Sequence, residues 1–196
     1  MRFVSLSFLL AAFALSAGAG CAVPNDDASA EASESDLTRP SDRALEGKLR
    51  GILRDVSFTS EADYEYVVFE GDVVSEGALD EALVRQKLHA AVQTNNSSGR
   101  DILPSSCRAS ALKVDEAIAD GAAASNDPDD TSARHDRQLG IALKVMRSQL
   151  KSVVGFTFGT NASGDMDEVG TVLYVYVGIS KTTGKLIAIM TEAVYT

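Results

Sequence analysis

Residues Thr171–Ile179 read TVLYVYVGI, a run in which most side chains are apolar or aromatic. In a β-strand, successive side chains point to opposite faces of the sheet. One face of this strand would carry Leu173, Val175, Val177 and Ile179, and the other would carry Val172, Tyr174 and Tyr176. A sheet that is apolar on both faces must be covered on both. The segment therefore predicts a central strand between two layers of helices.

Two more strands neighbour this segment in the sequence. Val153–Gly159 precedes it and Leu186–Val194 follows it, and both are rich in β-branched and apolar residues. Turn-forming segments, Asn161–Asp167 and Lys181–Gly184, separate the three strands. The last strand repeats the alternation, with Ile187 and Ile189 facing away from Leu186, Ala188 and Met190. This pattern predicts a C-terminal meander of antiparallel strands.

Helical periodicity supplies the covering layers. A first helix is expected after Ser41, whose hydroxyl can cap it, and a second over Leu79–Val92. A third begins at one of three capping residues and has an apolar stripe. The caps are Asp129, Asp130 and Thr131, and the stripe is Leu139, Leu143, Met146 and Leu150.

The segments between these helices predict two more strands. Tyr64–Glu70 has the β-branched and aromatic composition of a strand and ends at Gly71. A short strand is expected around Leu112–Val114. The predicted fold class is α/β (α+β), a three-layer α–β–α sandwich whose sheet is largely antiparallel and ends in the C-terminal meander.

Residues 1–20 are typical of a signal peptide. Arg2 precedes the apolar run Phe3–Leu15, which is too short for a comfortable membrane span. Two processing alternatives stay open. Cleavage after Ala17-Gly18-Ala19 would release a soluble periplasmic or secreted protein. A lipobox ending at Cys21 would instead place a lipid on that cysteine and anchor the protein to a membrane, and the position of the cysteine favours this alternative.

Residues 21–40 form an acidic stretch that is poor in apolar side chains. Such a composition cannot bury enough apolar surface to fold, so we expect a disordered tether. A single domain would then occupy residues 41–196. The chain as a whole is also acidic. The chain has 28 acidic and 18 basic residues, a formal net charge of −10, which disfavours nucleic acid as a direct partner and favours a basic protein.

Residues able to carry catalysis are few. His89 and His135 are expected on two different helices, where exposed histidines are usually inert. Cys107 could pair with Cys21 in a disulfide if Cys21 carries no lipid. A Cys107–His135 nucleophile pair is disfavoured because nothing near Cys107 in the sequence would activate its thiol. We expect neither an enzyme nor a cofactor.

Two blocks of sequence carry a family resemblance. The first is Ser60–Tyr64 running into the strand Val67–Gly71. The second runs from Ser148–Lys151 through the strands of the meander to Leu186–Thr196. Together they resemble the nuclease A inhibitor family of bacteria. That resemblance implies an α–β–α sandwich and inhibition of a sugar-non-specific endonuclease, a nuclease protein that carries a divalent metal ion.

The resemblance also implies which residues bind the nuclease. Glu61 and Thr196 would enter its active site. Ser60, Asp63 and Tyr195 are further candidates for contact with the nuclease, and Tyr195 stands where the family has an acidic residue. The carboxylate and hydroxyl of Thr196 are hard oxygen ligands of the kind that Mg²⁺ accepts, so Thr196 would bind the partner's metal ion. Glu61 would pair with an arginine of the nuclease.

A second hypothesis uses the same fold for another purpose. An envelope lipoprotein could act as a general protein-binding module without a nuclease target. This alternative stays open because Ala62 and Glu65 stand where the family has Ser and Pro, and Gly121–Asp130 lacks the aromatic residue of the corresponding family segment. Aromatic side chains often dominate binding energy at protein interfaces.

Overall fold

The computed structural model describes residues 41–58, 64–74, 78–95, 109–127, 129–159 and 170–195. All of them belong to one unit of the chain, Ser33–Thr196. The expected signal peptide, the tether with Cys21, and Cys107 lie outside the described residues. Among the residues that are described, no helix is both long enough and apolar enough to cross a bilayer.

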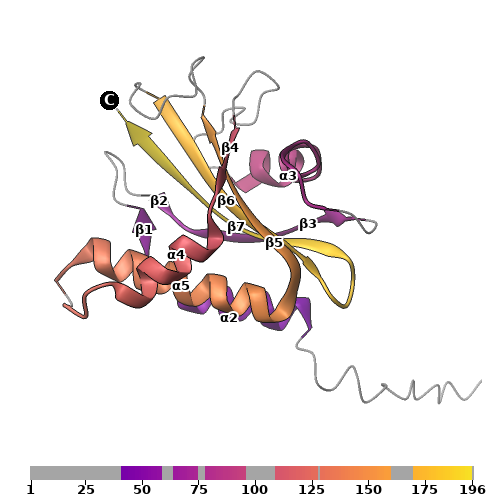
Figure 1. The fold of residues 1–196 in the computed structure, drawn as a ribbon. Helices are drawn as coiled ribbons and strands as arrows, with labels where there is room; N and C mark the ends of the chain where they lie inside the picture. The colour runs from indigo at the N-terminus through magenta and orange to yellow at the C-terminus, as the bar shows by residue number, and fades with distance from the viewer. Residues whose placement is uncertain are drawn as a thin grey trace, which may run out of the picture. The chain divides into compact units, whose positions relative to one another are not determined.

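Five strands form the main sheet, and every neighbouring pair is antiparallel (Figure 1). In order across the sheet they are β3 (Val67–Val73), β7 (Lys185–Tyr195), β6 (Gly170–Ser180), β5 (Leu150–Gly159) and β4 (Ala109–Leu112). Strands β5, β6 and β7 are neighbours in both sequence and space, which confirms the predicted meander.

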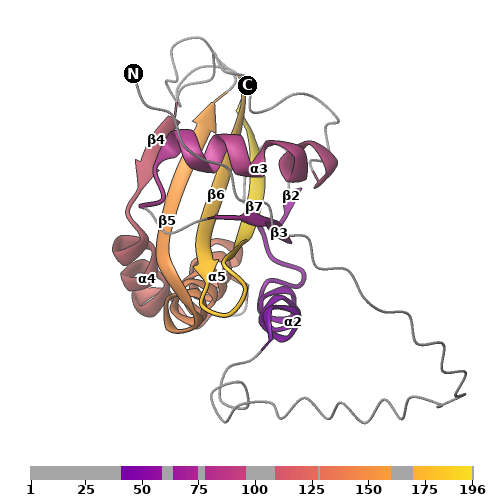
Figure 2. The ribbon, with the colours of Figure 1, turned by 90° about the vertical axis from the view of Figure 1, so that its right-hand side faces the viewer.

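Helices cover both faces of this sheet, as Figure 2 shows. Helix α3 (Glu81–Asn95) packs on one face, where its Val84, Leu88 and Val92 are buried. The other face is covered by α2 (Asp42–Ile52), α4 (Val114–Ala123) and α5 (Thr131–Gln149). The three-layer α–β–α sandwich is therefore confirmed.

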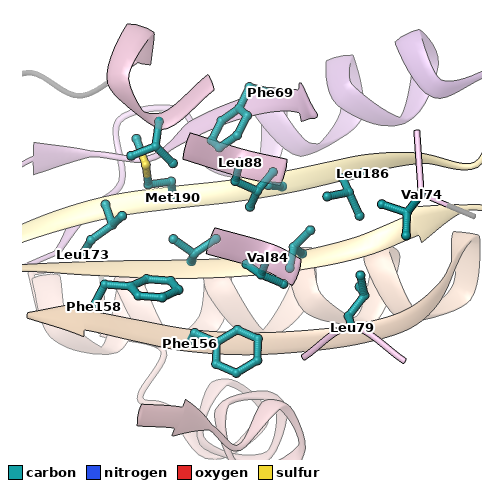
Figure 3. Close-up of a cluster of buried hydrophobic side chains, with 14 of the residues drawn as sticks. Phe69, Val74, Leu79, Val84, Leu88, Phe156, Phe158, Leu173, Leu186 and Met190 are labelled. Atoms are coloured by element: carbon teal, nitrogen blue, oxygen red, sulfur yellow. The ribbon is translucent and has the colours of Figure 1, made fainter. Parts of the chain in front are cut away.

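The side chains of the central strands divide between the two faces as predicted. Leu173, Val175, Val177 and Ile179 of β6 lie in the core beneath α3, together with Leu186, Ala188 and Met190 of β7 (Figure 3). Tyr176, Ile187 and Ile189 lie in the core beneath α2, α4 and α5. Burial on both faces explains why these strands have almost no polar side chains.

Two helix starts also follow the sequence signals. The Ser41 hydroxyl accepts a hydrogen bond from the backbone N–H of Ala44 at 3.3 Å, which caps α2. Of the three candidates for the cap of α5, Asp130 takes the position, and its carboxylate accepts from the Ala133 N–H at 2.9 Å.

The prediction was less accurate in two places. The expected strand Tyr64–Glu70 is interrupted at Tyr66, so β2 (Tyr64–Glu65) pairs with β1 (Ser57–Phe58) as a separate two-stranded sheet. The strand expected around Leu112–Val114 ends at Leu112, and Val114 begins α4. Asp115 and Glu116 in the first turn of α4 favour a helix start through the helix dipole.

Helix α4 packs closely against α5 through two glycines. A Cβ atom added to Gly121 would lie 2.4 Å from the carbonyl oxygen of Asp136 and 2.8 Å from the Cα of Gly140. Both neighbours are backbone atoms, so neither can rotate away. This contact fixes the position of α5 near its N-terminal half.

We expect Gly121→Ala to lower the free energy of unfolding by about 1–3 kcal/mol, because the added methyl group overpacks the α4–α5 contact. Gly47→Ala in α2 is the matched control, since nothing lies within 4 Å of its added Cβ. That change should raise the free energy of unfolding by about 0.5–1 kcal/mol through helix propensity alone. Urea unfolding followed by circular dichroism measures both. Equal effects of the two substitutions would contradict the close contact.

Candidate functional site

The residues predicted to bind a partner lie mostly beyond what the structure describes. Ser60, Glu61, Asp63 and Thr196 are outside the described residues. Of Tyr195 the backbone is described, and it is the last residue of β7. The described part of the candidate site consists of the strands that lead to these residues.

Strands β1 and β2 lie on either side of the segment 59–63, which contains Glu61. Ser57 pairs with Glu65 and Phe58 with Tyr64, so the two strands form a hairpin that encloses residues 59–63. Both strands contact β7 (Figure 1). The Thr191 hydroxyl donates a hydrogen bond to the Tyr64 carbonyl oxygen at 2.9 Å. The hairpin is thus attached to the C-terminal half of β7.

The C-terminal half of β7 stays in the sheet to its last described residues. Thr171 of β6 pairs with Val194, and Gly170 pairs with Tyr195. Strand β7 therefore remains hydrogen-bonded to a neighbour up to the position before Thr196. The hairpin that flanks residues 59–63 and the end of β7 lie at the same end of the sheet.

Other connecting segments begin or end at this same end of the sheet. Strand β5 ends at Gly159 and β6 begins at Gly170, while Ala109 of β4 pairs with Phe158. The segments 59–63, 96–108 and 160–169 are thus all joined in sequence to strands at this end of the sheet. Their acidic residues are Glu61, Asp63, Asp101, Asp165, Asp167 and Glu168, against the basic Arg100 and Arg108. The chain segments joined to this end are acidic by sequence.

A buried histidine lies beneath the hairpin. His135 of α5 is 8% exposed, which corrects the expectation that it would be an exposed helix histidine, whereas His89 of α3 is exposed. The Phe58 ring meets the His135 ring edge-on at 5.2 Å, and Tyr66 stacks on it at 5.7 Å. Phe58 also stacks on Tyr174 of β6 at 4.7 Å.

Both ring nitrogens of His135 are engaged. Its Nδ1 lies 3.0 Å from Asp136 Oδ1, and its Nε2 lies 2.8 Å from the Tyr66 hydroxyl. An ionised carboxylate only accepts hydrogen bonds, so Nδ1 carries the proton and donates to Asp136. In the neutral imidazole, Nε2 then accepts the hydrogen bond that the Tyr66 hydroxyl donates. We call Phe58, Tyr66, His135 and Asp136 the His135 cluster.

Burial keeps the Tyr66 hydroxyl protonated. Removal from water raises the pKa of Tyr66 well above its ordinary value, and the negative charges of Tyr176, Asp136 and Tyr174 raise it further when they are ionised. A protonated phenol can donate to Nε2 of the neutral imidazole. The His135 cluster is a fully paired polar contact between α5 and the chain that follows the hairpin. Sequence reasoning missed it, because no local pattern links Tyr66 with a residue 69 positions away.

A cavity of about 360 Å³ lies at the opposite end of β6, beside the β6–β7 turn. Lys151, Ser152, Ile179 and Lys181 are among its lining residues. The Lys181 ammonium group donates to the Ser148 carbonyl oxygen at 2.9 Å, so it satisfies a free carbonyl near the end of α5. Lys181, which lines this cavity, therefore caps the end of α5. Within the described residues, no three His, Cys, Asp or Glu side chains group as metal ligands.

Comparison of the chain with protein-family models finds no match, and comparison with curated proteins finds none either. The resemblance to the nuclease A inhibitor family therefore depends on the two sequence blocks and the order of the secondary-structure elements.

Buried tyrosines near the site predict a loss of stability in alkali. Burial raises the pKa of Tyr176 to about 12, with the charge of Asp136 adding to the shift. Below about pH 10 the tyrosine is protonated in both states, so its contribution to stability is fully present. Between about pH 10 and 12 the unfolded chain loses the proton and the folded chain keeps it, so stability falls by about 1.4 kcal/mol per pH unit.

The comparison of Tyr176→Phe with the native chain isolates this contribution. Urea unfolding at pH 8 gives the baseline difference, where the tyrosine is neutral in both states. Between pH 10 and 12 the variant should lose less stability than the native chain, and its slope should be shallower by about 1.4 kcal/mol per pH unit. Parallel slopes for the two proteins would contradict the raised pKa of Tyr176.

Proposed function

We propose that this protein inhibits a metal-dependent, sugar-non-specific nuclease. The observation that carries the proposal is the attachment of the β1–β2 hairpin to β7. Its two strands enclose residues 59–63, and the Thr191–Tyr64 hydrogen bond ties them to the strand that leads to Thr196. The two segments that the family resemblance assigns to nuclease binding are therefore joined to one end of the sheet. Had they been joined to opposite ends, a single partner site could not engage both.

The last strand supports the proposed role of Thr196. Strand β7 is paired on both sides over part of its length, with β3 and with β6, and its pairing with β6 continues to Tyr195. A ligand group attached to a rigid strand loses little conformational entropy on binding. We infer that the carboxylate and hydroxyl oxygens of Thr196 bind the catalytic metal ion of the nuclease, where they replace water and block access of the substrate phosphate.

The proposed role of Glu61 comes from the family resemblance. Nucleases hold the substrate phosphate with arginine, and a carboxylate can accept two parallel hydrogen bonds from a guanidinium group. Glu61 would occupy that arginine while Thr196 occupies the metal ion. Ser60, Asp63 and Tyr195 would contact the nuclease around them. The acidic segments at this end of the sheet would accelerate association with a basic nuclease.

The proposal includes export. A signal peptide over residues 1–20, a tether over residues 21–40 and a lipid on Cys21 would hold the inhibitor at a bacterial membrane. Without the lipid, the protein would be periplasmic or secreted. In either case the inhibitor would meet nucleases outside the cytoplasm.

The position of the terminal carboxylate provides the first test. One residue added after Thr196 should raise the inhibition constant for a magnesium-dependent non-specific endonuclease by about 100-fold, because the metal-binding carboxylate moves away. Thr196→Ser keeps both oxygen groups and is the matched control, so it should inhibit like the native chain. DNA cleavage is measured with the full chain over a range of inhibitor concentrations. Equal inhibition by the extended and native chains would rule out metal binding by Thr196.

The outcome also separates the two functional hypotheses. A native chain that leaves several such nucleases unaffected favours the general binding module. Capture of proteins from the host's secreted fraction, with the full chain as bait, should then yield partners other than a basic nuclease.

Charge pairing provides the second test. Glu61→Gln should weaken inhibition by about 10- to 100-fold, mainly through faster dissociation, because an arginine of the nuclease loses its charged partner. Asp120→Asn is the control, since Asp120 is an exposed acid of α4 and belongs to none of the segments at the proposed binding end. Association of all three proteins should slow as salt is raised. Equal dissociation rates for Glu61→Gln and Asp120→Asn would contradict the pairing.

A further inference from the structure

The β1–β2 hairpin needs support from outside itself. Each of its strands has two residues, and the hairpin forms its own sheet beside the five-stranded one. A two-stranded hairpin of this length is not stable alone in water. Its orientation must therefore come from contacts with the rest of the domain.

The described contacts divide into two kinds. Backbone and hydroxyl contacts hold the hairpin to its sequence neighbours and to β7. The Tyr66 N–H donates to the Val56 carbonyl oxygen at 3.4 Å, and Thr191 donates to the Tyr64 carbonyl oxygen. Side-chain contacts hold it to β6, where Phe58 stacks on Tyr174, and to α5, where Phe58 and Tyr66 both lie against the His135 ring. Phe58 and Tyr66 come from opposite ends of the hairpin, so His135 contacts both ends.

We propose that His135 is a positioning residue, which sets the orientation of the β1–β2 hairpin relative to β7 through Tyr66 and Phe58. The inference rests on the proposed function, since the hairpin contains Glu61. His135 itself touches neither the nuclease nor its metal ion in this proposal.

The geometry favours orientation over simple packing. An apolar ring at position 135 would fill the same space but would give the Tyr66 hydroxyl no hydrogen-bond acceptor. The hydrogen bond from the Tyr66 hydroxyl to Nε2, at 2.8 Å, restricts the tyrosine to one direction. The bond from Nδ1 to Asp136 in turn fixes the tautomer that can accept it. Helix α5 holds the histidine firmly, because Gly121 of α4 packs against the carbonyl of Asp136.

The test uses three variants of the full chain. His135→Phe and Tyr66→Phe each leave one polar group of the pair without its partner. The double variant His135→Phe/Tyr66→Phe removes both polar groups and keeps ring packing, so its global stability should stay close to that of the native chain. His89→Phe, at the exposed histidine of α3, is the control.

Two measurements are made on each protein. Amide hydrogen exchange compares the backbone N–H of residue 66, which directly follows the hairpin and donates to Val56, with those of Val175 and Ile189 in the β6–β7 pairing. Surface plasmon resonance measures dissociation from a magnesium-dependent non-specific endonuclease. In the double variant we expect exchange of the residue 66 backbone amide to rise about tenfold, with Val175 and Ile189 unchanged, and dissociation to be about tenfold faster. His89→Phe should match the native chain in both.

Several results would overturn the proposal. Unchanged exchange of the residue 66 amide in the double variant would show that His135 does not orient the hairpin. Equal acceleration at residues 66, 175 and 189 would assign His135 to general stability alone. Faster exchange with unchanged dissociation would separate hairpin orientation from nuclease binding. If the native chain itself does not bind the nuclease, the proposed function fails, while the exchange measurement still decides whether His135 positions the hairpin.

Discussion

The pairing of β6 with β7 is the contact on which the rest of the structure depends. It runs without a break from Gly170↔Tyr195 to Ile179↔Leu186. Both strands bury side chains on both faces of the sheet. One face lies beneath α3, and the opposite face lies beneath α2, α4 and α5. Neither helical layer could remove its apolar face from water without this central ribbon. The same pairing carries β7 in a fixed direction to Tyr195.

The two ends of this ribbon have different surroundings. At the β6–β7 turn, Ser180 and Thr183 donate to the carboxylate of Asp42, and the Ser180 hydroxyl accepts from the N–H groups of Thr182 and Thr183 at 3.1 Å. This network joins the start of α2 to the turn. Gly184, at a φ of +73°, provides the left-handed conformation that closes the turn. The other end of the ribbon receives the hairpin, the end of β7 and the acidic connecting segments.

The strands and helices that could be predicted from the sequence are those in which burial repeats with a regular period. Thr171–Ile179 alternates between two apolar faces, so its place at the centre of the sheet followed directly. Helix α4 was missed because Ala and Gly dominate Ala117–Ala123, and neither residue creates a clear apolar stripe. The break at Tyr66 was missed for another reason. Tyr66 has a strand-forming residue type, and its hydrogen bond to His135 connects it with a residue far along the chain.

The same distinction applies to the site. Glu61 and Thr196 came from a resemblance between short sequence blocks, and a resemblance names residues without saying what holds them. The supporting contacts, Thr191 to Tyr64 and His135 to Tyr66, connect residues more than sixty positions apart, so no local pattern could indicate them. They are also hydrogen bonds inside an otherwise apolar layer. Apolar packing alone would stabilise the hairpin in many similar orientations. The two directional hydrogen bonds, from Thr191 to Tyr64 and between Tyr66 and His135, favour a single orientation. The hairpin depends on such contacts more than the five-stranded sheet does, because its own ladder has only two residues in each strand.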